Sequence, residues 1–334
     1  MPLLSVDELT VTFGGRGRTP STAVDGVSFD VDQGQVVGLV GESGCGKSVT
    51  SLALMGLLPR KGVTVTGRAA FDGADLLTMS PKQLRDMRGS QLAMIFQDPL
   101  SSLNPVVPVG VQVTEILERH RGLKGEPARK EAASLLDRVG IPDPARRLKE
   151  YPHQLSGGMR QRALIAMAVA CAPRLLIADE PTTALDVTIQ AQILELLKEL
   201  VDQEGTALLM ITHDLGVVAG LCDQVNVLYA GKVVESAGRR ELFAHPTHPY
   251  AHGLLGSIPR LDAPRGEPLN PIRGSINDKI AWADGCAFAP RCDHYTMECL
   301  TGTPELTEPR AAGHQVRCVN PVLPPVLPTA EVSA

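Results

Sequence analysis

Residues 41–48 read Gly41-Glu42-Ser43-Gly44-Cys45-Gly46-Lys47-Ser48, and this glycine-rich stretch decides the fold. An apolar run at 36–40 comes directly before it, and a run of mixed apolar and small residues at 49–58 follows it. A strand, a glycine loop and a helix in this order form a phosphate-binding loop, because backbone N–H groups and the helix N-terminus then converge on an anion. The alternative, a chance glycine-rich turn, accounts for the glycines but not for the strand and helix beside them. We therefore expect an α/β fold of the P-loop class.

The residues of this loop have separate expected tasks in binding ATP. Lys47 would reach the β- and γ-phosphates, and the Ser48 hydroxyl would ligand Mg²⁺. The other positions expected to contact the nucleotide are Gly41, Ser43, Gly44, Cys45, Gly46 and Val49. Cys45 also lies beside Lys47 at a helix N-terminus, which predicts a lowered pKa and a reactive thiol whose alkylation blocks ATP binding.

A second apolar run, at 175–178, ends in two carboxylates, Asp179 and Glu180. Such a run is typical of a buried strand in a parallel sheet. Asp179 is expected to hold Mg²⁺ through water, and Glu180 to polarise the water that attacks the γ-phosphorus. His213 follows the apolar run at 207–212 and is expected to contact the γ-phosphate. The alternatives are a solvated acidic strand end and a structural histidine.

A third motif lies in sequence between the phosphate loop and the acidic strand end, and it reads Leu155-Ser156-Gly157-Gly158-Met159-Arg160-Gln161-Arg162. With these three motifs the chain, over about residues 3–260, resembles the nucleotide-binding subunit of an ABC transporter. In that family the signature motif of one subunit closes over ATP held by the phosphate loop of the other. The resemblance implies this role for Ser156, Gly157, Gly158 and Met159, the last of which stands where many relatives have Gln.

The resemblance assigns tasks to three further residues. Phe13 resembles the aromatic residue that stacks on adenine, although relatives usually have Tyr there and a core Phe is the alternative. Gln97 resembles the glutamine that senses Mg²⁺ and water, and Asp186 the residue that links the two ATP sites of a dimer. The implied catalytic residues are Glu180, His213, Lys47 and Gln97, and the implied Mg²⁺ site consists of Ser48, Gln97 and Asp179.

Two other stretches resemble the peptide-transport branch of the family. One runs from Gln97 to Pro105, and the other contains His248-Pro249-Tyr250 followed by residues 253–259. This resemblance implies an ATPase that powers the import of di- or oligopeptides from the cytoplasmic face of the cell membrane. It also implies as partners a pair of permeases, a related second ATPase rather than a second copy, and an extracytoplasmic binding protein. Nickel or glutathione import and a soluble ABC ATPase acting on ribosomes or DNA remain alternatives.

Four of the seven cysteines lie in the proline-rich last part of the chain, at Cys286, Cys292, Cys299 and Cys318. In a reducing cytosol, thiols gathered in this way bind a metal more often than they form disulfides. Their spacing is unlike the two-residue gaps of ferredoxins and zinc knuckles, so an iron–sulfur cluster, zinc and free thiols all remain open. The pattern resembles the C-terminal cysteine motif of peptide-transporter ATPases, which implies a [4Fe–4S] cluster, with Zn²⁺ as the alternative. A redox protein that uses ATP as a signal is a further alternative for the function of the chain.

Two other cysteines, Cys171 and Cys222, lie in apolar surroundings and are expected to be buried.

The resemblance also implies the domain organisation. A RecA-like ABC nucleotide-binding domain would occupy residues 1–245, with an N-terminal antiparallel β subdomain and a helical subdomain inserted at about 98–165. A proline- and cysteine-rich extension at 246–320 and a flexible tail at 321–334 would follow.

Periodicity supports helices at three places. Apolar residues recur at helical spacing in residues 111–119 and 128–139 of the insertion, and in residues 187–203, whose apolar stripe is expected to pack on the sheet.

Composition narrows the range of expected partners and the expected compartment. The formal net charge of −5 gives no case for nucleic-acid binding. Because the chain contains no signal peptide and no apolar run of about 18 residues, we expect a cytosolic protein that meets the membrane only through partners.

Overall fold

The computed structural model describes residues 1–14, 19–183, 185–257, 272–275, 285–309 and 311–323. A seven-stranded sheet lies at its centre, in the order β11-β10-β9-β3-β8-β7-β6. Strands β6, β7, β8, β3 and β9 are parallel, while β10 and β11 join antiparallel. The bounds are β3 Val36–Val40, β6 Leu92–Ile95, β7 Leu175–Asp179, β8 Ala207–Thr212, β9 Gln224–Tyr229, β10 Lys232–Gly238 and β11 Gln315–Val316. Every residue of β3, β7 and β8 is buried, which explains why these strands are apolar runs without alternation.

A second sheet, formed by strands on either side of β3 in sequence, confirms the predicted N-terminal antiparallel subdomain. Its order is β2-β1-β4-β5, and all of its pairs are antiparallel. The strands are β1 Leu4–Phe13, β2 Ser21–Val31, β4 Val63–Phe71 and β5 Ala74–Asp75. Its buried face packs on α1, Lys47–Leu54, which begins at the phosphate loop, so this sheet helps to fix the loop in place.

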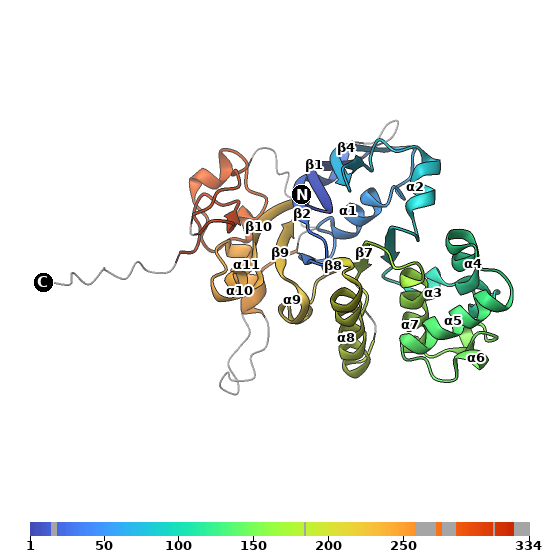
Figure 1. The fold of residues 1–334 in the computed structure, drawn as a ribbon. Coiled ribbons are helices and arrows are strands. Elements are labelled where there is room, and N and C mark those ends of the chain that lie inside the picture. The colour runs from blue at the N-terminus through green and yellow to red at the C-terminus, as the bar shows by residue number, and fades with distance from the viewer. Residues whose placement is uncertain (15–18, 184, 258–271, 276–284, 310, 324–334) are drawn as a thin grey trace, which may run out of the picture.

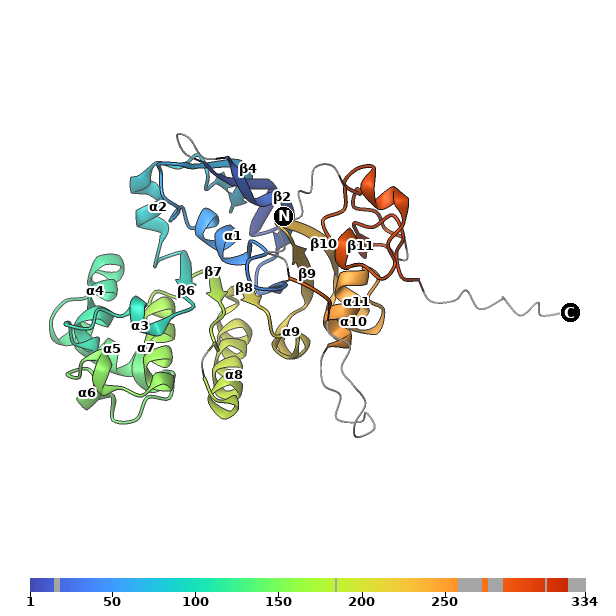
Figure 2. The same ribbon diagram turned by 180° about the vertical axis from the view of Figure 1, so that it is seen from behind.

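The helices fall into groups on opposite sides of the central sheet. Figure 1 shows α3 to α7 gathered at one end and the C-terminal elements at the other, and the view from behind in Figure 2 shows the same separation. The first group comprises α3 Pro99–Ser102, α4 Val109–Arg121, α5 Glu126–Arg138, α6 Pro144–Arg147, the short η1 Pro152–Gln154 and α7 Gly157–Val169. The predicted helices at 111–119 and 128–139 are confirmed as the slightly longer α4 and α5.

The other helices cover the sheet and lead into the C-terminal extension. They are α2 Pro81–Met87, α8 Val187–Glu204, α9 Leu215–Leu221, α10 Arg239–Ala244 and α11 Pro249–Gly256, followed by η2 Ala289–Arg291 and η3 Met297–Leu300. In the part of the chain that the structure describes, no helix combines the length and apolarity needed to cross a membrane.

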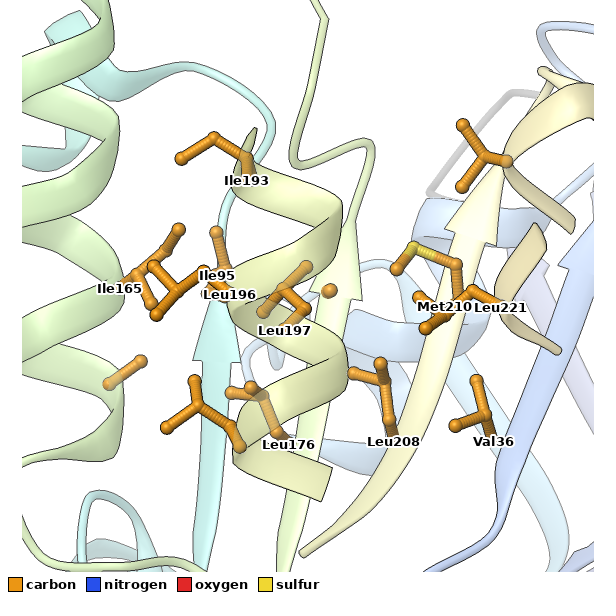
Figure 3. Packing of buried hydrophobic residues seen from close by; sticks show 14 of the residues in the cluster. Val36, Ile95, Ile165, Leu176, Ile193, Leu196, Leu197, Leu208, Met210 and Leu221 are labelled. Atoms are coloured by element: carbon orange, nitrogen blue, oxygen red, sulfur yellow. The ribbon is translucent and has the colours of Figure 1, made fainter. Parts of the chain in front are cut away.

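The main core lies between α8 and the sheet, as the periodicity predicts. Figure 3 shows Ile193, Leu196 and Leu197 of α8 facing side chains of the strands, among them Leu176 and Leu208. All five are buried. Each such side chain contributes about 1.5–3 kcal/mol on burial, so this stripe is enough to hold α8 against the sheet. The core therefore fixes the carboxyl ends of β3, β7 and β8, where the chemistry-bearing residues lie.

The C-terminal extension is built onto the central sheet. β11 pairs with β10 through Glu235↔Val316 and Ser236↔Gln315, and the Arg317 N–H donates to the Val234 carbonyl at 2.8 Å. The boundary between residues 245 and 246 stays a prediction, as does the extent of the helical insertion. Most of the predicted tail, from residue 324 onward, lies outside the described residues.

Candidate nucleotide-binding site

The predicted phosphate loop joins the end of β3 to the start of α1, as the strand–loop–helix pattern requires. Two of its glycines are sterically necessary. Gly41 has φ 153° and a Cβ there would lie 2.2 Å from the Leu228 carbonyl oxygen, while Gly46 has φ 108° and a Cβ would lie 2.4 Å from the Ala23 oxygen. The loop is therefore wedged against β2 and β9, and only glycine allows that approach.

Lys47 and Ser48 connect this loop to the acidic strand end. The Lys47 ammonium donates to the carbonyl oxygens of Gly41 at 2.7 Å and Glu42 at 3.0 Å, so the side chain folds back over the loop. The Ser48 hydroxyl donates to Asp179 Oδ1 at 3.0 Å. A hydroxyl and a carboxylate at this distance are oxygen ligands of the kind that Mg²⁺ prefers. The residues at this point are suited to Mg²⁺, and their role as its ligands stays a prediction.

Glu180 is held at its carboxylate by three side chains. Gln97 Nε2 and Thr183 Oγ1 each donate to Oε2 at 2.8 Å, and His213 Nδ1 lies 3.1 Å from Oε1. Burial opposes ionisation of Glu180, but the hydrogen bonds from Thr183 and His213 and the nearby positive charges together lower its pKa. The backbone of Glu180 is also in the left-handed region, with φ 47°, a conformation that few non-glycine residues adopt. The carboxylate is thus ionised and fixed in orientation.

Sequence reasoning placed Gln97, Glu180 and His213 in one site, and the structure brings them together. It missed Thr183, although the Thr lies three residues after Glu180 and its hydroxyl could have been considered as a donor.

The carboxyl of Asp179 differs from that of Glu180 in the direction of its pKa shift. Burial and the neighbouring Glu180 charge raise the pKa of Asp179. A cation at the predicted Mg²⁺ site would favour the ionised form.

The signature motif faces solvent at the start of α7. Ser156 is the N-cap of this helix, and its hydroxyl accepts the Met159 N–H at 3.3 Å. Ser156 and Gly157 are exposed, and nothing within 4 Å surrounds the position of a Cβ on Gly157. Asp186, also exposed, caps α8 by accepting the Ile189 N–H at 3.0 Å. Ser156 and Gly157 thus lie at an exposed helix N-terminus, a position that suits an anion brought by another molecule.

The remaining residues that are predicted to contact the nucleotide are the aromatic Phe13 and three residues of the phosphate loop and its helix. Phe13 ends β1 and packs partly against the core of the first sheet, with part of its ring accessible. Ser43 and Gly44 are exposed at the tip of the loop, and Val49 is half-buried on α1. The structure does not contradict a nucleotide contact at any of them.

The prediction of a reactive Cys45 is wrong. Cys45 is 0% exposed, and burial raises the pKa of its thiol more strongly than the Lys47 charge lowers it. The sequence shows the lysine and the helix N-terminus but not the packing that removes water from the sulfur. Cys222 is buried as predicted, and burial raises its pKa to about 12, whereas Cys171 is only half-buried.

The four C-terminal thiols line one small cavity. Cys286, Cys292, Cys299 and Cys318 surround it together with His248 and Phe288, among others. Burial is the main cause that raises the pKa of Cys292 and of Cys318 to about 11, and the neighbouring thiols add to it. The cavity has about 10 Å³, room for roughly one water molecule. Among the described residues, no three or more His, Cys, Asp or Glu side chains are placed to hold a metal ion. The donor chemistry is that of a thiolate-bound metal or cluster, but the space would have to widen to admit one.

Comparisons with known proteins agree with the geometry of both regions. Residues 24–183 match the family described as ABC transporter, and residues 234–299 match the oligopeptide/dipeptide transporter C-terminal region. The chain is 53% identical to the dipeptide transport ATP-binding protein DppD of Bacillus subtilis, over 95% of this chain and 94% of the relative. It is 50% identical to DppD of Escherichia coli, over 96% and 98%, and 48% identical to the oligopeptide transport ATP-binding protein OppD of Salmonella typhimurium, over 96% and 94%.

Solved structures give the same result for the fold. The dimeric structure of a bacterial ABC transporter cassette superimposes with a TM-score of 0.64 at 29% identity, covering 71% of this chain and 99% of that chain. A dimeric post-hydrolysis state of the same kind of ATP-binding cassette, bound to ADP and Pi, gives a TM-score of 0.64 at 28% identity with the same coverage. The predicted fold class is confirmed.

Proposed function

This chain belongs to the ABC transporter family, in its oligopeptide and dipeptide branch, and on that premise we propose that it hydrolyses ATP to power the import of di- or oligopeptides. The observation that carries the proposal is the pairing of the hydrogen-bonded group around Glu180 with a C-terminal region of the peptide-transporter type. The relatives at 48–53% identity are dipeptide and oligopeptide transport ATP-binding proteins, which supports peptides over nickel chelates or glutathione.

In the proposed hydrolysis, Glu180 orients and polarises the attacking water. Its lowered pKa keeps the carboxylate ionised at neutral pH, and the hydrogen bonds from Gln97 and Thr183 fix one oxygen while His213 lies at the other. Lys47 would leave the loop carbonyls to meet the β- and γ-phosphates. Mg²⁺, when bound with ATP at Ser48, Gln97 and Asp179, supplies charge neutralisation at the phosphates.

The site needs a partner subunit to be complete. Ser156 and Gly157 are exposed at the N-terminus of α7, where they would cover ATP held by another chain, and Asp186 is exposed at the start of α8. We propose a related second ATPase as that partner, with Asp186 linking the two sites. The pair would dock on two permeases at the cytoplasmic face of the membrane, and an extracytoplasmic binding protein would deliver the peptide.

The four C-terminal thiols are proposed to bind a [4Fe–4S] cluster, with Zn²⁺ as the alternative metal. Support comes from the donor set, since all four thiols line the same cavity in a segment with few other core residues. Iron, sulfide and zinc analysis of protein purified without oxygen separates these possibilities. About four irons and four sulfides per chain support the cluster, and one zinc or no metal contradicts it.

The transport proposal is tested by isolating the native protein from gently solubilised membranes. Recovery with two multi-spanning permeases and a related ATPase, and ATP hydrolysis stimulated by di- or oligopeptides with the binding protein, are the expected results. Recovery only in the soluble fraction would favour a non-transport ATPase. Stimulation by nickel chelates or glutathione but not by peptides would contradict the substrate class while leaving the ATPase assignment intact.

A further inference from the structure

An arginine of the C-terminal extension contacts the phosphate loop. Arg291 ends η2, immediately before Cys292, and its guanidinium donates to both carboxylate oxygens of Glu42 at 2.6 and 2.9 Å. Glu42 is the second residue of the phosphate loop, 249 positions earlier in the chain. The Arg291 side chain is 6% exposed. The Glu42 side chain is 31% exposed, so the pair is buried on the arginine side only, and its two-pronged geometry fixes distance and angle together.

The remaining donors of Arg291 are also used. Nε donates to the Arg273 carbonyl at 2.6 Å, and Nη2 also donates to the Gly274 carbonyl at 3.3 Å. The guanidinium lies over the rings of Tyr229 and Phe288, 5.7 and 6.0 Å from their centroids. The cation is therefore held in one orientation before any ligand arrives.

A second contact from the same extension holds the backbone of Glu42. The Tyr250 hydroxyl accepts the Glu42 N–H at 2.9 Å, and Tyr250 is fully buried with its ring 4.6 Å from that of Tyr229. The other backbone group of Glu42, its carbonyl, accepts from Lys47 at 3.0 Å. Side chain, N–H and carbonyl of this one loop residue are thus all fixed, two of them by the extension.

The residues behind these contacts are the walls of the thiol cavity. Phe288 and His248 line that cavity, Phe288 packs on Tyr229 and Tyr250, and His248 Nδ1 accepts the Tyr250 N–H at 3.0 Å. His248 is 1% exposed and its Nε2 has no hydrogen-bond partner, which leaves a buried polar atom among the cavity-lining residues. A change in the cavity would therefore displace the groups that hold Arg291 and Tyr250.

We propose that Arg291 and Tyr250 are positioning residues for the phosphate loop, and that they make nucleotide affinity depend on the state of the thiol cavity. The physical reason is preorganisation. A loop whose Glu42 is fixed loses less conformational freedom when it closes around phosphate, so ATP binds more tightly. This coupling acts in both directions. A change that fixes the residues lining the thiol cavity strengthens ATP binding, and ATP binding in turn stabilises that fixed arrangement of the cavity.

The first test measures the affinity of a fluorescent ATP analogue, a readout that does not need hydrolysis or a partner. Arg291→Gln and Glu42→Gln should each weaken binding about tenfold, and the double variant should be no weaker than either single one, because both remove the same pair. Arg291→Lys, which keeps the charge but not the two-pronged geometry, should lie between. The matched control is Arg240→Gln, an exposed arginine on α10 that takes no part in these contacts and should not change affinity.

The second test concerns the cavity. Cys292→Ser should weaken analogue binding in the otherwise unchanged chain but have a smaller effect in the Arg291→Gln background, where only the Tyr250 contact still connects the cavity to Glu42. Glu42→Gln keeps the test valid should the Arg291 variant fold poorly, since it leaves the extension unaltered. Affinities of Arg291→Gln and Glu42→Gln equal to that of Arg240→Gln, or losses that add in the double variants, would overturn the proposal.

Discussion

At the scale of single residues, the proposed general base, the Glu180 carboxylate, is held in a defined position. Gln97, Thr183 and His213 surround Glu180, and their contacts leave its carboxylate one orientation. Glu180→Gln removes the negative charge but keeps the shape of the side chain. We expect ATP hydrolysis to fall roughly 10²- to 10⁴-fold while binding of an ATP analogue is retained, because general-base assistance is lost and the phosphate loop is untouched.

Phosphate release and analogue binding, measured on the same preparation, check this expectation. Thr183→Val should slow hydrolysis less, since it removes only one of the hydrogen bonds. The matched control is Glu199→Gln, an exposed acid on α8, which should change neither measurement. Hydrolysis by Glu180→Gln at the rate of Glu199→Gln would mean that another group activates the water.

At the scale of elements, the signature helix shows how local capping serves a second purpose. Ser156 stabilises α7 through its hydroxyl and stands exposed where a partner's ATP would arrive. Ser156→Arg should abolish ATP hydrolysis by the assembled transporter without weakening analogue binding to this chain, because its own phosphate loop is unaltered. The matched control is Ser80→Arg, which removes the N-cap of α2 and should cost a similar amount of stability, about 1 kcal/mol, without stopping hydrolysis. Equal hydrolysis by the two variants would remove the signature from the active site.

The elements also show how far the sequence alone could lead. Long periodic segments such as those of α4, α5 and α8 are predictable because their apolar residues repeat at the spacing of the core face. β11 is not, since two residues, Gln315 and Val316, carry no period and pair with a distant strand. The Arg291–Glu42 pair and the burial of Cys45 likewise depend on contacts between segments far apart in sequence, so charge and spacing near each residue could not reveal them.

At the scale of the whole molecule, one buried carboxylate of the ATPase core holds both ends of the extension. Glu235 of β10 is 0% exposed and accepts the N–H groups of Thr247 and His248 at 2.8 Å and a hydrogen bond from His314 Nε2 at 2.7 Å. These three donors come from both ends of the extension, and β11 pairs with the strand that carries Glu235. The core therefore loses a partner if either end of the extension detaches, which predicts that the two parts unfold together.

His314→Ala tests this unity. Removing the imidazole leaves a buried carboxylate short of one donor, which should lower the free energy of unfolding by about 3 kcal/mol, a large share of the usual 5–15 kcal/mol of a domain. Urea unfolding followed both by circular dichroism and by hydrogen exchange of amides in the extension and in the central sheet should give a single transition that shifts as a whole. His252→Ala, an exposed histidine on α11, serves as the control and should change the midpoint little. Two separate transitions, of which only one moves in His314→Ala, would show that the extension folds independently, and the phosphate loop would then be held by a part of the molecule that can detach from it.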